Sequence, residues 1–414
     1  MNAIDRKVAK VRGLVRHEGV GGLAARGLTR LARRVAPPSH ALSVARADVL
    51  AAAEVQAAGG PAPAPLPVLP GEPLTIAFVI TPPDEGSGGH TTTFRLVGAL
   101  ERAGHRCVLY FYDRWGDSFA HHEAILREWW PWVRAEVRDA ADGVEDAHAV
   151  VATAWTTAYA VLASPAKGTR FYLVQDLEPL FYPAGGEALL AEATYRFGFH
   201  GITAGPWLAQ RMRADYGMPA DHFDFGCDLA RYGLSDAHGA RTGVCFFARQ
   251  ITPRRAFDLG MLALEVFHQR HPDVPIHIYG DPVGKLPFPA TDHGVLTPDE
   301  LNALYNRCVA GLTLSATNVS LVPHEMLASG CIPVVNDADH NRLVLANDHV
   351  AYAPATPTDL ADALGRLVAR PAADVAAGAA AASASVADRS WDEAGAVVER
   401  AISRVVREAA DAGA

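Results

Sequence analysis

Residues 74–112, LTIAFVITPPDEGSGGHTTTFRLVGALERAGHRCVLYFY, decide the fold of this chain. The stretch opens with a nearly continuous apolar run, which is typical of a parallel strand buried on both faces. A glycine-rich turn follows, and Phe94, Val97 and Leu100 then recur at the spacing of one helix face. A second apolar run at 107–112 predicts another strand. This strand–turn–helix–strand order is the unit from which doubly wound α/β domains are built.

Strand and helix patterns alternate through two long stretches of the chain. Further strands of the first stretch are predicted at 149–154, 171–176 and 201–204. The alternation restarts with strands at 244–248, 276–280, 310–315 and 332–335, and with helices at 259–269, after the capping box of Thr297, and near Glu325. We therefore predict an α/β fold with two Rossmann-like domains that face a cleft, in which ligands bind at the carboxyl ends of the strands.

Shifts in composition predict the boundaries of five parts. They are a basic helical N-terminal extension at 1–56, a Pro/Ala-rich linker at 57–73, an N-terminal Rossmann-like acceptor domain at 74–240, a C-terminal Rossmann-like nucleotide domain at 241–390, and a C-terminal helix at 391–414 that packs back on the N-terminal domain.

The first 40 residues are strongly basic. Nine cations face only Asp5 and Glu18: Arg6, Lys7, Lys10, Arg12, Arg16, Arg26, Arg30, Arg33 and Arg34. Apolar residues recur among them at helical spacing, so the segment could lie on an anionic membrane surface. The alternative is an ordinary helix that packs on its own domain. We expect a cytoplasmic protein, with peripheral contact to the inner face of the cell membrane as the further hypothesis.

Composition excludes several classes of protein. The net charge of −9 over 414 residues argues against nucleic-acid binding. No uninterrupted apolar run reaches the length of a membrane-spanning helix, and no signal peptide is visible. The five cysteines are scattered without a CxxC pair, which indicates reduced thiols and no structural zinc.

A carboxylate beside small residues marks residues 315–335, SATNVSLVPHEMLASGCIPVV. Glu325 is expected near a helix start, where a carboxylate can accept both hydroxyls of a ribose. The backbone N–H groups of Ser320, Leu321 and Val322 are placed to bind phosphate oxygens. The plainer interpretation of Glu325 is an ordinary acid at a helix N-terminus.

These residues resemble the signature of glycosyltransferase family 4, in which a glutamate precedes Ala-x-x-Gly-x-Pro-Val. The matching positions here are Glu325, Ala328, Gly330, Pro333 and Val334. The family usually carries another glutamate eight residues earlier, which contacts the donor sugar, and this chain has Thr317 there. The resemblance therefore implies sugar contacts that differ from those of the family.

A basic loop follows a predicted strand in residues 245–260, CFFARQITPRRAFDLG. Arg249 with Arg254 or Arg255 can clamp a diphosphate and stabilise the leaving charge. Family 4 enzymes place an arginine and a lysine here, so the sequence does not decide between Arg254 and Arg255. The alternative is a pair of solvated loop arginines. Tyr279 with Gly280 and Val295 with Leu296 are expected to flank the nucleotide base.

Residues 172–208 are rich in aromatic and acidic side chains. Asp176 and Glu178 are expected at a strand end, where the carboxylate of either residue can orient an acceptor hydroxyl. Of the two, Asp176 is the predicted catalytic group. Phe181, Tyr182 and Tyr195 can stack on sugar rings, although core packing is an equally common role for single aromatics.

Together, the segments SGGHTTTFRL, FARQITPRRAF and 172–208 resemble WsaF-type rhamnosyltransferases over roughly residues 74–350. That resemblance implies a GT-B fold, a dTDP-β-L-rhamnose donor and a saccharide or lipid-linked saccharide acceptor of a bacterial surface glycan. It also implies retention of anomeric configuration without a metal or other cofactor, so the DAD at 337–339 is expected to be a polar turn.

The glycine turn of the opening stretch lacks the lysine of a P-loop and the third glycine of a dinucleotide fingerprint. We predict that Gly88 and Gly89 let the backbone approach the donor, and that His90 contacts the transferred sugar. The alternative is a helix-capping turn without a ligand. For the chain as a whole, two other functions stay open: a sugar-nucleotide epimerase or hydrolase, and a non-catalytic glycan-binding subunit.

Overall fold

The computed structural model describes residues 42–60, 65–69, 71–116, 118–235 and 239–413. The basic residues of the predicted membrane-contacting segment all precede residue 41 and lie outside this part of the chain. The described residues divide into two compact units. Unit 1 includes the chain up to Thr203, with Met212–Asp221 and Gly395–Ala414, and unit 2 includes Ala204–Arg211 and His222–Ala394.

Unit 1 is built on a seven-stranded sheet in the order β3-β2-β1-β4-β5-β6-β7. Neighbouring strands from β3 to β6 pair in parallel, and the direction of winding reverses between β1 and β4. That reversal is the switch point at which such sheets bind ligands. The strands are β1 (Thr75–Ile80), β2 (Arg106–Phe111), β3 (Glu136–Asp139), β4 (Ala149–Ala152), β5 (Thr169–Val174), β6 (His200–Ala204) and β7 (Ala220–Phe223).

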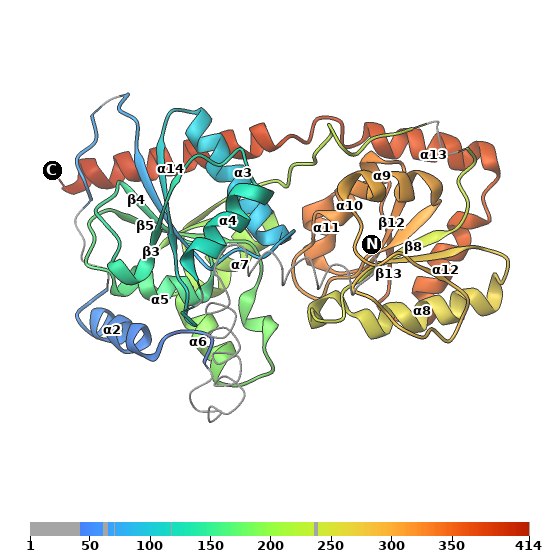
Figure 1. Cartoon of the computed structure of the whole chain (residues 1–414), viewed down its shortest axis with the longest axis horizontal. Helices are drawn as coiled ribbons and strands as arrows, with labels where there is room; N and C mark the ends of the chain where they lie inside the picture. Colours follow the sequence, from blue (N-terminus) through green and yellow to red (C-terminus); the bar gives the residue numbers. More distant parts are fainter. Residues whose placement is uncertain (1–41, 61–64, 70, 117, 236–238, 414) are drawn as a thin grey trace. The chain divides into compact units, whose positions relative to one another are not determined.

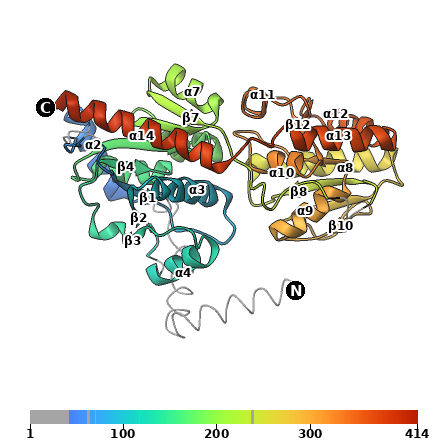
Figure 2. The same cartoon turned by 90° about the horizontal axis from the view of Figure 1, so that it is seen from above.

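Helices cover both faces of this sheet (Figure 1). The face of α3 that carries Phe94, Val97 and Leu100 is fully buried, which confirms the helical spacing. The long helix α14 runs beside α3 (Figure 2), and a Cβ added to Gly395 would meet Ala99 at 2.2 Å. The helices are α2 (Arg46–Ala57), α3 (Gly88–Arg102), α4 (Phe119–Trp129), α5 (Trp155–Ala163), α6 (Gly186–Thr194), α7 (Pro206–Tyr216) and α14 (Trp391–Gly413).

Unit 2 has a six-stranded parallel sheet in the order β10-β9-β8-β11-β12-β13. Its switch point lies between β8 and β11. The strands are β8 (Val244–Ala248), β9 (Ile276–Gly280), β10 (Thr291–Asp292), β11 (Ala310–Leu312), β12 (Ile332–Asn336) and β13 (Ala351–Ala353). The two sheets confirm the prediction of an α/β fold with two Rossmann-like halves.

In unit 2, α8 packs against α12, and α10 packs against α9 and α13 (Figure 1). The capping box is confirmed, because Thr297 and Glu300 exchange hydrogen bonds at the start of α9. The helices are α8 (Phe257–Arg270), α9 (Pro298–Arg307), α10 (Val322–Ala328), α11 (Asp339–Leu345), α12 (Pro357–Val368) and α13 (Ala372–Ala384).

Three predicted strands end two or three residues earlier than expected. The strands predicted at 149–154, 171–176 and 310–315 end at Ala152, Val174 and Leu312. The residues beyond these ends form loops at the carboxyl edges of the sheets. All five cysteines are buried free thiols. No helix in the described residues is long and apolar enough to cross a membrane.

Candidate functional site

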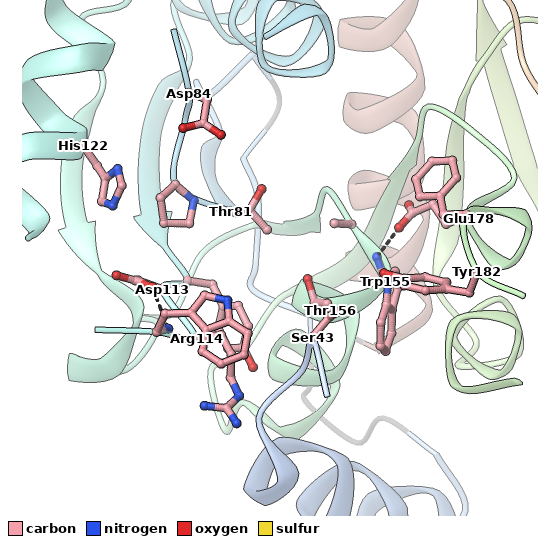
Figure 3. A pocket seen from close by; sticks show the side chains of 15 residues that line it. Ser43, Thr81, Asp84, Asp113, Arg114, His122, Trp155, Thr156, Glu178 and Tyr182 are labelled. Atoms are coloured by element: carbon pink, nitrogen blue, oxygen red, sulfur yellow. Dashed lines mark hydrogen bonds between the residues drawn. The ribbon is translucent and has the colours of Figure 1, made fainter. Parts of the chain in front are cut away.

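A pocket of about 390 Å³ opens at the carboxyl ends of β1, β2, β4 and β5 in unit 1, around the switch point of that sheet (Figure 3). Its lining combines aromatic side chains with hydroxyl, carboxylate and guanidinium groups. The residues are Ser43, Thr81, Pro82, Asp84, Tyr112, Asp113, Arg114, Trp115, His122, Ala154, Trp155, Thr156, Glu178, Phe181 and Tyr182. Aromatic faces with polar groups at their edges are typical of sites for sugar rings.

Two aromatic walls face each other across this pocket. On one side, the indole Nε1 of Trp155 donates to the hydroxyl of Tyr182 at 2.9 Å, and the two rings meet edge to face. On the other side, the guanidinium of Arg114 lies 4.9 Å from the centre of the Trp115 ring. Figure 3 shows Trp155 and Tyr182 on the side opposite Asp113 and Arg114.

Hydrogen bonds to Glu178 hold the wall formed by Trp155 and Tyr182. Its carboxylate accepts from the backbone N–H of Trp155 at 2.7 Å and from the hydroxyl of Tyr172 at 2.9 Å. The residue is only 6% exposed and begins a short 3₁₀ turn, Glu178–Phe181. Glu178, Phe181 and Tyr182, three of the predicted acceptor residues, are therefore brought together at one pocket.

The other two residues of this segment lie behind the pocket. Tyr195 is 1% exposed, and its hydroxyl donates to the carbonyl of Asp176 and accepts from the N–H of Glu178. Its ring has no open face, so the expectation that Tyr195 stacks on a sugar is wrong and core packing applies. The side chain of Asp176 is also buried and accepts from the N–H of Leu177 at 2.9 Å.

The glycine turn has one glycine that the backbone requires. Gly86 has a φ of 69°, whereas Gly88 and Gly89 are the first residues of α3 and have no positive φ. A Cβ added to Gly88 would meet nothing within 4 Å, and one added to Gly89 would approach only the Gln175 side chain, at 3.9 Å. Both glycines therefore leave open space above the start of the helix.

The side chain of His90 forms hydrogen bonds within the glycine turn. Its Nε2 lies 2.9 Å from the carbonyl oxygen of Thr81, which only accepts, so this nitrogen carries the proton. Its Nδ1 lies 2.9 Å from the hydroxyl of Ser87. Burial lowers the pKa of His90. Both ring nitrogens have partners within the turn, so His90 helps to position Thr81 and Ser87, and its contact with a sugar stays a prediction.

In unit 2, the predicted arginines lie at the switch point. Arg249 follows β8 directly, and its Nη1 lies 3.3 Å from a carboxylate oxygen of Asp281. Arg255 ends the 3₁₀ turn Pro253–Arg255, and its Nη1 donates to the Ser315 hydroxyl at 2.8 Å and to the Asn318 carbonyl at 3.0 Å. Arg255 thus holds the loop that follows β11.

Thr317 occupies the position where the resembling family has its first glutamate. It is 1% exposed, and its hydroxyl has no hydrogen-bond partner among the residues that the structure describes. The surrounding loop is held by Asn336, whose side chain accepts from the N–H of Ser315 and donates to its carbonyl. A buried threonine in a fixed loop presents no charge to a sugar.

Glu325 lies on α10 with its side chain half-buried. No hydrogen bond to its carboxyl group occurs within the described residues, and burial together with the nearby charge of Asp228 raises its pKa to about 7. A carboxyl group that is desolvated and lacks a donor gains hydrogen bonds when a ligand brings hydroxyl groups to it. The N–H groups of Ser320, Leu321 and Val322 likewise find no acceptor in the described part of the chain.

The residues expected to flank a base differ in accessibility. The hydroxyl of Tyr279 is 2.8 Å from that of Tyr305 in the core, so its side chain is closed to a ligand. Gly280 has a φ of 111°, and a Cβ there would meet the carbonyl oxygen of Ala248 at 2.2 Å. Val295 is exposed and Leu296 is half-buried.

The DAD sequence forms a polar turn. Asp337 pairs with Arg342, and Asp339 begins α11. No group of three or more His, Cys, Asp or Glu residues that could hold a metal is present in the described ranges.

Several pocket residues escaped the prediction from sequence. Asp113, Arg114 and Trp115 follow β2, and Trp155 and Thr156 follow β4. The sequence did carry a signal for these residues. Both strands were predicted, and polar or aromatic residues directly after parallel strands indicate a ligand site. Nothing in the sequence pattern indicated Ser43, which reaches the pocket from outside the sheet.

Comparison with known proteins identifies relatives of part of the chain. Residues 242–365 match the family model described as "WsaF, C-terminal domain". The O-antigen biosynthesis protein RfbC of Myxococcus xanthus is 36% identical over 218 residues, which are 50% of this chain. The chain spans 17% of the length of that relative.

Solved structures of similar fold include HepE of Anabaena in complex with UDP-glucose, with a TM-score of 0.61 and 15% identity over 81% of this chain and 100% of that one. WaaG, a glycosyltransferase involved in lipopolysaccharide biosynthesis, has a TM-score of 0.56 and 12% identity over 79% of this chain and 99% of that one. At these identities the likeness shows the fold, which confirms the GT-B prediction. The resemblance to WsaF is confirmed for residues 242–365.

Proposed function

We propose that this chain is a glycosyltransferase that moves a sugar from a nucleotide-diphosphate donor to a saccharide of a bacterial surface glycan. The observation that carries the proposal is at the switch point of unit 2, where Arg249 and Arg255 follow β8. There Glu325, whose carboxyl group has no hydrogen bond within the described residues, lies on the helix before β12. The WsaF C-terminal domain match over 242–365 and the relative in O-antigen biosynthesis support it.

Unit 2 binds the donor in this proposal. Glu325 accepts hydrogen bonds from the ribose hydroxyls, and the N–H groups of Ser320, Leu321 and Val322 approach the diphosphate. Arg249 and Arg254 supply positive charge to the leaving diphosphate, which stabilises the charge that develops as the sugar bond breaks. Arg255 positions the loop that follows β11, because its guanidinium is bonded to Ser315 and Asn318.

Unit 1 binds the acceptor in the pocket lined by Trp155, Tyr182 and Trp115. The acceptor hydroxyl attacks the anomeric carbon on the face that the nucleotide leaves, and the departing phosphate oxygen takes the hydroxyl proton. This step retains the anomeric configuration and requires no metal. Gly88 and Gly89 leave room for a phosphate or a sugar at the start of α3.

We further propose dTDP-β-L-rhamnose as the donor and a lipid-linked saccharide as one class of acceptor. The support is the resemblance to WsaF-type rhamnosyltransferases across three segments of the chain. Val295 is exposed near the end of β9, where an apolar side chain can pack on the base. The HepE structure holds UDP-glucose, so donors with uracil are the first competitors to test.

A thermal-shift panel tests the donor. We expect dTDP-rhamnose to raise the melting temperature more than dTDP-glucose, UDP-glucose or GDP-mannose at equal concentration. A response to UDP- or GDP-sugars alone contradicts the donor proposal.

Product analysis with and without a saccharide acceptor tests the activity, because release of free sugar or of an isomerised donor indicates the hydrolase or epimerase. Absence of any donor response indicates a glycan-binding subunit, a function that the buried, uncharged Thr317 favours.

A further inference from the structure

The segment that precedes the first Rossmann-like half crosses the edge of the unit 1 pocket. Residues 42–45 lead into α2, which packs against α5, and Val44 is completely buried. Ser43 lines the pocket, and Figure 3 shows it at the edge between the two aromatic walls. We call residues 42–57 the pocket strap.

One end of the pocket strap holds the wall formed by Tyr182 and Trp155. The N–H and the hydroxyl of Ser43 both donate to one carboxylate oxygen of Glu187, at 2.9 and 2.7 Å. Tyr182 lies next to Ser43 at the pocket edge, and its hydroxyl accepts from the Trp155 indole. This end of the strap is therefore anchored to α6, beside the wall formed by the two rings.

The next residues of the strap hold the opposite wall. The N–H of Ala45 donates to the hydroxyl of Tyr112 at 3.0 Å, and that hydroxyl donates to a carboxylate oxygen of Asp48 at 2.5 Å. Tyr112 follows β2 directly and leads into Asp113, Arg114 and Trp115. The strap thus joins the loop after β2 to the segment after β5, on the two sides of the space where a ligand would lie.

We infer that the pocket strap is a specificity element, which sets the spacing of the two aromatic walls so that the pocket takes an uncharged saccharide ring. Aromatic side chains on both sides match the apolar faces of a sugar, and Thr156 also lines the pocket. Three carboxylates, Asp84, Asp113 and Glu178, outnumber the single arginine, so an acidic sugar meets a repulsive field. The inference rests on the proposed function only in taking this saccharide to be the acceptor.

A purely structural strap is the competing explanation, because α2 also buries Ala52 against unit 1. Asp48 distinguishes the two explanations, because it does not line the pocket and its carboxylate accepts from the Tyr112 hydroxyl, which does. If the strap sets the spacing of the two aromatic walls, Asp48→Ala changes saccharide binding at temperatures well below that of unfolding. Asp48→Asn keeps an oxygen acceptor for Tyr112 and should restore most of the binding. Tyr110→Phe is the matched control, because it removes a buried hydroxyl from β2 that contacts Glu145 and Arg138 outside the pocket.

The experiment is saturation-transfer NMR on the full chain with four methyl glycosides: α-L-rhamnoside, β-D-glucoside, β-D-galactoside and β-D-glucuronide. We expect at least one neutral glycoside to bind, the glucuronide to bind at least tenfold more weakly, and Asp48→Ala to weaken the neutral glycosides about tenfold while Tyr110→Phe leaves them unchanged. Binding that is unaffected by Asp48→Ala, equal binding of the glucuronide, or no binding of any glycoside overturns the inference.

Donor binding, measured in parallel by thermal shift with dTDP-rhamnose and UDP-glucose, keeps this inference separate from the proposed function. Asp48→Ala should leave the donor shift intact. If no donor binds while neutral glycosides still bind in an Asp48-dependent way, the transferase proposal fails and the strap inference stands. If donors bind and sugar is transferred while Asp48→Ala changes nothing, the strap inference alone fails.

Discussion

Arg255 donates a hydrogen bond from Nη1 to the Ser315 hydroxyl at 2.8 Å, and so joins the loop after β8 to the loop after β11. The same nitrogen reaches the Asn318 carbonyl. Ala256, the next residue, has a φ of 47°, so the turn carries an uncommon backbone conformation just before α8. Because the guanidinium of Arg255 is bonded within the protein, we expect Arg255 to act on stability and Arg249 to act on the leaving diphosphate.

Arg255→Ala should lower stability. It leaves buried acceptors of the 315–318 loop without their charged donor, which typically costs about 1–3 kcal/mol. Urea unfolding measures the loss, and Arg255→Lys should recover part of it because the ammonium can reach one acceptor but not hold the same fork geometry. Equal stability of wild type and Arg255→Ala would show that the loop is held by other contacts.

Arg249→Ala should lower activity and leave stability nearly unchanged. Its ion pair with Asp281 is partly exposed, and such pairs contribute little to folding. Loss of a preorganised cation at the leaving group costs about 2–4 kcal/mol in the transition state, which appears as a fall in kcat/KM of roughly two to three orders of magnitude. The proposed diphosphate role fails if Arg249→Ala keeps full turnover. Arg231→Ala, which removes another partly exposed arginine of unit 2, serves as the control.

Donor binding should depend on pH through Glu325. Burial and Asp228 raise the pKa of this carboxyl to about 7, and ribose hydroxyls bind best to the ionised form. Affinity should therefore fall about tenfold from pH 8 to pH 6, as the ionised fraction falls with it. A dTDP-sugar is the right probe, because its esterified diphosphate does not titrate in this range. Glu325→Gln should bind more weakly at pH 8 and show a flat profile, and a wild-type profile that is also flat would contradict the ribose assignment.

Much of the fold follows from the sequence, and the reasons are visible in particular elements. The apolar segments β1, β8 and β9 were placed within a residue or two, because burial on both faces leaves a clear pattern, and the buried face of α3 was identified from its helical spacing. The short strands β3, β10 and β13 have two to four residues, too few for any periodicity, and their pairing with β2, β9 and β12 depends on contacts distant in sequence.

The site could be predicted only where a strand end carried the signal. Arg249 and Glu178 follow predicted strands and were expected at strand ends. Tyr195 and His90 had the right residue type in the right segment, but their role depends on which hydrogen bonds the fold gives them, with Asp176 and Glu178 for one and Thr81 and Ser87 for the other. The contribution of Ser43 depends on a contact across 144 positions with Glu187, which no local pattern contains.

The two kinds of glycine in the turn before α3 predict opposite effects of alanine. Gly89→Ala should raise stability by up to about 1 kcal/mol, because the site has helical geometry and open space for a Cβ. Gly86→Ala should lower stability by about 1 kcal/mol, since its φ is 69°. If Gly89 leaves room for a ligand, Gly89→Ala also loses turnover despite folding better. Full activity of Gly89→Ala would show that the glycine serves the helix start alone.

His324 should make the protein sensitive to acid. It is 1% exposed beside Phe225, and neither ring nitrogen has a hydrogen-bond partner in the described residues. Burial lowers its pKa from 6.5 to about 3. Between these two pH values the unfolded chain binds a proton at this residue and the folded chain does not. The stability is therefore complete above about pH 6.5 and falls as the pH drops towards 3, by about 2 kcal/mol at pH 5.

His324→Phe tests this directly, because phenylalanine keeps an aromatic ring in the same site without a buried polar atom. Urea unfolding at pH 7.5 and pH 5 should show a smaller loss between the two values for His324→Phe than for wild type, by about 2 kcal/mol. The variant should also be at least as stable at pH 7.5, since the unpartnered nitrogens already carry a desolvation cost there. His222→Gln is the control at an exposed histidine and should lose stability in acid as wild type does. An acid loss in His324→Phe equal to that of wild type would assign the sensitivity to other buried groups, of which His277, with its pKa lowered to about 4 by burial and by His293, is the first to examine.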